Sequence, residues 1–143
     1  MENEVHERVK DFLFGGNACF TLLQEGTGCK KSVSVRYRIV QSKDNKNMYF
    51  VYTNPIGEKE LKYHGYIFNG SFKKAKNLKF NPASYNEKAI IALQWLLVKG
   101  DNLPRIVHVL HDGKCSRCGR KLKDVESLRC GLGPECRKKV GKV

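Results

Sequence analysis

The sequence is organised around Cys115-Ser-Arg-Cys118, which is followed by Cys130-Gly-Leu-Gly-Pro-Glu-Cys136. Four of the six cysteines therefore fall within one short segment, in the arrangement C-x2-C-x11-C-x5-C. A C-x2-C pair forms a tight knuckle that points two thiolates at one ion, and a second pair about a dozen residues further on can complete a tetrahedron. Four thiolates leave no open position for a substrate, so the pattern predicts one structural Zn²⁺.

The second pair has a longer spacing than most zinc fingers, and its residues explain how it could work. Gly131 and Gly133 permit a sharp turn, and Pro134 suits the first position of a helix that carries Cys136. Free thiols and a redox C-x2-C are the alternatives, but no βαβ unit is indicated around the cysteines. Disulfides need an oxidising compartment, and the acidic, polar N-terminus does not resemble a secretory signal.

The cysteine segment also resembles a small zinc-binding domain of unknown function that occurs at the C-terminus of many phage and prophage proteins. The resemblance covers residues 111–138 and is carried by Cys115-Ser-Arg-Cys118-Gly-Arg-Lys-Leu, Glu126-Ser127 and Gly131-Leu-Gly-Pro-Glu-Cys136. It implies zinc binding and a phage context, and it supplies no activity.

The fourth zinc ligand has two candidates. The firmer anchors of the family match Cys115, Cys118 and Cys136, and a histidine just ahead of the knuckle is common, which here is His111. The cysteine spacing favours Cys130 instead. We therefore predict the ligand set Cys115, Cys118, Cys130 and Cys136, with His111 as the alternative to Cys130.

The length and composition are those of a globular protein. The 143 residues are 41% hydrophobic, which is enough for one core, so we predict a core domain at 1–111 and a zinc-binding module at 112–143. No apolar run approaches the ~18 residues that span a bilayer. We expect a monomeric cytoplasmic protein without a membrane partner, located in a bacterial host cell if the phage resemblance holds.

Hydrophobic patterning predicts the α+β class. Alternation of apolar and polar residues indicates strands at 17–24, 32–39, 48–53, 61–68 and 105–111. Helical spacing indicates a short helix at 2–13 and a long one from the capping box Ser84-Tyr-Asn-Glu87 to Lys99. The expected fold is an antiparallel meander sheet packed on one long helix, with a C-terminal module resembling a treble clef.

The charge predicts attraction to polyanions. The formal net charge is +13, so we expect contact with DNA, RNA or a nucleoprotein, although basic surfaces also serve solubility and compensate zinc-bound thiolates. The candidate contacts lie on one strand, in a basic loop with interleaved phenylalanines, and beside the cysteines. They are Arg36, Arg38, Lys73, Lys74, Lys76, Lys79, Arg117, Arg120 and Lys121.

No catalytic motif is present, so we do not expect an enzyme. One hypothesis is a phage inhibitor of a host defence nucleoprotein, in its sharpest form an anti-CRISPR protein against a Cas9-type effector. A chain of charge +13 cannot mimic DNA, so it would hinder DNA loading or activation by another route. The alternative is a basic nucleic-acid-binding accessory protein of phage replication or recombination.

Overall fold

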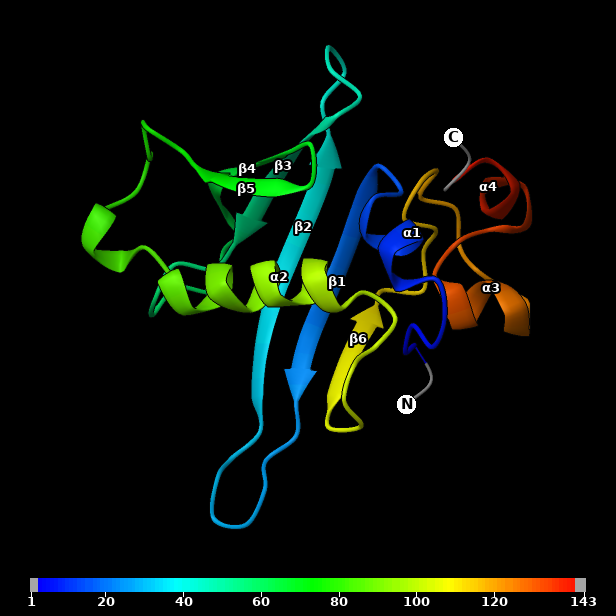
Figure 1. Cartoon of the computed structure of the whole chain (residues 1–143), viewed down its shortest axis with the longest axis horizontal. Coiled ribbons are helices and arrows are strands. Elements are labelled where there is room, and N and C mark those ends of the chain that lie inside the picture. The colour runs from blue at the N-terminus through cyan, green and yellow to red at the C-terminus, as the bar shows by residue number, and fades with distance from the viewer. Residues whose placement is uncertain (1–2, 141–143) are drawn as a thin grey trace.

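An antiparallel meander of five strands, with a sixth strand on its first edge, forms the centre of the molecule (Figure 1). The computed structural model describes residues 3–140. Its strands are β1 (Asn17–Gln24), β2 (Val33–Gln41), β3 (Met48–Thr53), β4 (Lys62–Phe68), β5 (Ser71–Lys74) and β6 (Val107–His111), in the order β5-β4-β3-β2-β1-β6. Its helices are α1 (Val9–Leu13), α2 (Glu87–Lys99), α3 (Val125–Cys130) and α4 (Pro134–Lys139). The predicted α+β class with an antiparallel sheet is confirmed.

One face of the sheet forms the core with α2. The alternation in β1 places Ala18, Phe20 and Leu22 on this face, and all three are buried. Phe20 stacks on Tyr37 of β2 with 5.2 Å between ring centroids. Helix α2 lies across the strands (Figure 1). The Tyr37 hydroxyl donates a hydrogen bond of 2.6 Å to the carbonyl of Ala89 in this helix.

Three predicted elements differ from those observed. The helix predicted at 2–13 is confined to α1, because Arg8 has a left-handed backbone (φ 56°) and Glu4 pairs with Leu110 beside β6. Glu2, also assigned to that helix, lies outside the described residues.

The other two differences follow from capping and strand pairing. Helix α2 is capped by Asn86, whose side chain accepts from the Ala89 N–H at 3.1 Å, whereas Ser84 ends a 3₁₀ turn, η1 (Pro82–Ser84). The start of the predicted basic loop is strand β5, which pairs with β4.

The cysteine segment packs against the first residues of the chain. Strand β6 leads directly into this segment. The buried side chains of the segment form a small second cluster: Cys115, Leu122, Cys130, Leu132 and Cys136. The Asn17 N–H donates to the Ser116 carbonyl at 2.6 Å, and the His6 N–H donates to the Arg129 carbonyl at 2.7 Å. These bonds hold the segment against β1 and the residues that precede α1.

No helix among residues 3–140 is long and apolar enough to cross a membrane.

Gly131 offers a test of the packing between the cysteine segment and Phe12 of α1. It has φ 70°, and a Cβ there would lie 2.3 Å from the ring of Phe12. We expect Gly131→Ala to lower the free energy of unfolding by about 1–3 kcal/mol through crowding, in addition to the cost of its left-handed backbone.

Gly57→Ala is the matched control, because Gly57 has φ 82° with nothing within 4 Å of the added Cβ. Urea denaturation of both variants separates the two costs. Equal losses for the two variants would show that Phe12 does not constrain Gly131.

Candidate metal centre

The first two thiols are placed by a knuckle between Lys114 and Lys121, which pair as an isolated antiparallel bridge. The Cys115 N–H donates to the Arg120 carbonyl at 2.9 Å, and the Gly119 N–H donates back to the Cys115 carbonyl at 3.0 Å. Gly119 adopts φ 79°, which turns the chain sharply after Cys118. This closed turn directs the side chains of Cys115 and Cys118 to the same side.

The third thiol comes from the first turn of α4. Pro134 takes the first helical position and Gly133 precedes it as the N-cap, in agreement with the sequence prediction. Cys136 is therefore held two residues into a short helix that faces the knuckle.

The three thiols form a group that could hold a metal ion. The Sγ atoms of Cys115, Cys118 and Cys136 all lie within 4.8 Å of one another. Metal–sulfur bonds of about 2.3 Å place tetrahedral sulfur ligands about 3.8 Å apart, so only a small contraction is needed. Cys115 and Cys136 are buried and Cys118 is exposed, which leaves the group open on one side.

Backbone groups and one arginine favour thiolates here. Burial raises the pKa of the Cys115 thiol, but N–H groups of Cys118, Gly133 and Arg117 and the thiol of Cys136 lower it by more, to about 7. Burial raises the pKa of Cys136, and Arg117 opposes that rise. The Arg117 guanidinium lies 3.7 Å from the Cys136 sulfur, and its backbone N–H lies 3.4 Å from the Cys115 sulfur. Arg117 therefore contributes to the electrostatics of this group.

Cys130 and His111 lie outside the group of three. The Cys130 thiol is buried at the end of α3 and donates to the carbonyls of Glu126 at 3.3 Å and Leu132 at 3.6 Å. The two ring nitrogens of His111 face the Leu128 carbonyl at 2.8 Å and the Gly113 N–H at 2.9 Å. Both side chains are held by backbone groups in the packing around the centre.

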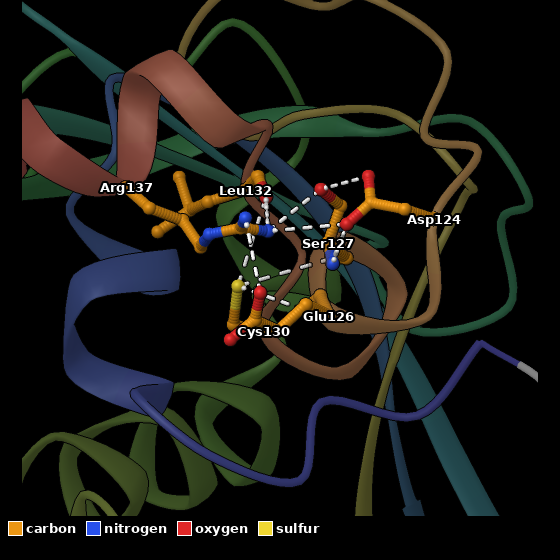
Figure 2. Close-up of polar contacts among 6 residues, drawn as sticks. All are labelled: Asp124, Glu126, Ser127, Cys130, Leu132 and Arg137. Atoms are coloured by element: carbon orange, nitrogen blue, oxygen red, sulfur yellow. Dashed lines mark hydrogen bonds and ion pairs between the residues drawn. The ribbon is translucent and has the colours of Figure 1, made fainter.

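A polar network that the sequence analysis missed fixes α4 against α3 (Figure 2). Asp124 caps α3 by accepting from the Ser127 N–H at 3.1 Å and from its hydroxyl at 2.6 Å. Arg137 donates to Ser127 Oγ at 2.7 Å and lies 3.5 Å from a carboxylate oxygen of Glu126. Asp at a helix start with Ser three residues on is a capping signal that could have revealed part of this network. Because Arg137 follows Cys136 directly, the network sets where that thiol points.

Of the other predicted contact residues, Arg120 and Lys121 lie in the knuckle and line a pocket with Cys118 and Cys136, whereas the rest lie on the sheet and its loops. Arg36 is paired with Asp112, and Arg38 Nε donates to Asn17 Oδ1 at 3.2 Å on the same strand face. Lys74 lies with its ammonium 4.3 Å from the Tyr85 ring centroid. The remaining predicted lysines and arginines are exposed: Lys73, Lys76, Lys79, Arg120 and Lys121.

The geometry predicts which cysteine substitutions remove the metal. We expect one metal ion per chain as purified, and its loss in Cys115→Ser, Cys118→Ser or Cys136→Ser, because each removes one thiolate of the group. Elemental analysis and thermal unfolding of each variant provide the measurement.

Cys130→Ser and His111→Ala serve as matched controls near the centre, and Cys29→Ser, which is exposed, serves as a distant one. We expect all three to retain the metal. A folded Cys130→Ser variant without metal would instead make Cys130 a ligand.

The cysteine segment matches a known protein family. Residues 107–141 match a family described as a family of unknown function (DUF6011). No curated protein and no solved structure matches the chain. The matched residues contain β6, the knuckle, α3 and Cys136, so this part of the chain is similar to that family.

Proposed function

We propose that this protein is a zinc-stabilised, non-catalytic protein that binds nucleic acid through its basic surface. The observation that carries the proposal is the excess of unpaired positive charge. Of the lysines and arginines among residues 3–140, only Arg8, Arg36, Lys62 and Arg137 form ion pairs with carboxylates. Since the chain has 27 such residues, most of its net charge of +13 is available to phosphates.

Zinc is the proposed metal because sulfur ligands in a tetrahedral arrangement suit it and it has no redox chemistry. We assign it a structural role. Apart from the cysteines, the buried set of the second cluster contains only Leu122 and Leu132. So small an apolar core contributes little to the free energy of folding. A bound metal would supply the stability that two leucines cannot.

The proposal also includes the finer fold assignment for the C-terminal module. A knuckle with two ligands followed by a helix with a ligand in its first turn is the arrangement of a treble clef. The arrangement of Cys115, Cys118 and Cys136 supports this assignment for a module at 112–143, of which residues 141–143 lie outside the described structure.

Salt dependence tests the proposed function. Fluorescence anisotropy with labelled oligonucleotides should show binding that weakens steeply between about 50 and 200 mM salt, because each phosphate contact releases counterions. Reversal of Lys73, Lys74, Lys76 and Lys79 to glutamate should weaken binding to every sequence alike and flatten the salt dependence.

A control variant carries the same number of reversals elsewhere, at Lys30, Lys31, Lys88 and Lys99, which are all exposed. We expect a smaller loss in this control, because it changes net charge without removing the proposed contacts. Absence of binding to any nucleic acid at low salt would overturn the proposal.

Inhibition of a host defence nucleoprotein is the second candidate, and an apolar groove favours it. The groove has a volume of about 470 Å³, runs between α2 and the ends of β1, β2 and β6, and is lined by Val33, Ile91 and Trp95 among others. Val33 and Ile91 are each 58% exposed, as is common where a protein partner docks.

The nucleoprotein candidate predicts a different response to salt. Inhibition of cleavage by a Cas9–guide complex should survive moderate salt and should be lost in Ile91→Asp. Unchanged cleavage at saturating protein would reject this candidate while leaving nucleic-acid binding intact.

A further inference from the structure

The face of the sheet that points away from α2, here called the open face, carries five aromatic side chains in adjacent rows. Strand β3 buries Val51 and Thr53 towards α2, so its other residues point the opposite way. The strand register places aromatic residues opposite one another on this face. The pairs are Phe50 with Tyr66 and Tyr52 with Tyr63, and Phe68 lies opposite Met48 in the next row.

These rings are separate from the core. None of the five belongs to the hydrophobic cluster beneath α2, all are partly accessible, and Phe68 retains 36% of its surface. The rings of Tyr52 and Tyr63 lie 5.7 Å apart at 54°, and those of Phe50 and Tyr63 lie 6.0 Å apart at 71°. Tilted and edge-on contacts do not cover the ring faces as parallel stacking would, so flat ligands can reach them.

Two of the three aromatic rows end in a cation, and the row of Phe68 ends at Ser71. Arg38 lies opposite Tyr52 at one end, and Lys73 lies opposite Tyr66 at the other. Both basic side chains are exposed, and neither forms an ion pair with a carboxylate of the described chain. Arg36, further along β2, is neutralised by Asp112. The positive charge of the open face therefore flanks the exposed rings.

We propose that the open face binds a single-stranded polynucleotide, with bases stacked on Phe50, Tyr52, Tyr63 and Tyr66 and phosphates held by Arg38 and Lys73. This inference rests on the proposed function and specifies its ligand. Exposed rings without neighbouring cations would suit an apolar partner, and cations without rings would suit any phosphate backbone. Their combination in the same rows matches a chain that offers both bases and phosphates.

The proposal separates single strands from duplexes. In a duplex the bases are stacked on one another, so only phosphates reach a protein surface of this kind, and the aromatic rows add nothing. A single strand can splay its bases onto the rings, and each stacked base contributes roughly a 5- to 150-fold gain in affinity. We therefore expect the protein to prefer a single strand of about 12 nucleotides to its duplex.

Aromatic pairs across strands also stabilise a sheet, and the test must distinguish that role from ligand binding. Tyr66→Phe keeps the ring, whereas Tyr66→Leu keeps an apolar side chain without it. We expect Tyr66→Phe to bind oligothymidine as the wild type does and Tyr66→Leu to bind it at least about fivefold more weakly. Thermal unfolding and metal content establish that each variant is folded.

A charge pair provides an independent variant. Lys73→Glu removes a cation from the open face, and Lys88→Glu makes the same charge change on α2. We expect the first to weaken single-strand binding severalfold more than the second. Oligouridine beside oligodeoxyuridine shows whether the 2′-hydroxyl contributes, since the two differ only in that group.

Photocrosslinking gives a readout on the unmodified protein. Oligonucleotides carrying 5-iodouracil should crosslink to the peptides that contain β3 and β4, as identified by mass spectrometry. Crosslinks confined to other peptides, or equal effects of Lys73→Glu and Lys88→Glu together with an unaffected Tyr66→Leu, overturn the open-face assignment while nucleic-acid binding stands. Absence of binding to single strands and duplexes alike rejects the proposed function as well.

Discussion

The backbone of Ser116 joins the parts of the molecule that the cysteines connect. Its N–H donates to the Gly131 carbonyl at 3.0 Å, and its carbonyl accepts from Asn17 at the start of β1. Gly15 approaches so closely that an added Cβ would lie 2.2 Å from Ser116 Oγ. Because Ser116 lies between Cys115 and Cys118, an ion held by those thiols also fixes the point where the sheet meets the C-terminal helices. The stability of the centre and that of the neighbouring sheet edge are therefore coupled.

The two faces of the sheet serve different purposes. On one face, Phe20 and Tyr37 pack beneath α2 and are completely buried, so substitutions there act through folding. On the open face, Tyr52 and Tyr66 are only partly buried, so substitutions there leave most of the core packing in place. This separation allows residues of the open face to change without a change of fold. It also explains why the arginines of β2, which lie on the open face, do not disturb the core.

Sequence patterns predicted the parts of the structure where one physical requirement dominates. Strict alternation placed the strands, because a buried face leaves only one register, and the knuckle spacing placed Cys115 and Cys118. The start of α2 was misplaced, because Ser84 and Asn86 are both good caps and only the tertiary contacts choose between them. The backbone partners of Cys130 and His111 could not be predicted from the sequence either. A cysteine or histidine whose side chain forms a hydrogen bond with the backbone cannot be distinguished, in the sequence, from one that binds a metal.

Strand β6 lies within the segment that is similar to a known family, at its start. It joins β1 through main-chain hydrogen bonds, which depend on backbone geometry more than on side-chain identity. The matched segment is therefore joined to the sheet by its own first strand. The attachment of this segment to the sheet tolerates sequence change in β6 and β1, as long as both backbones stay extended.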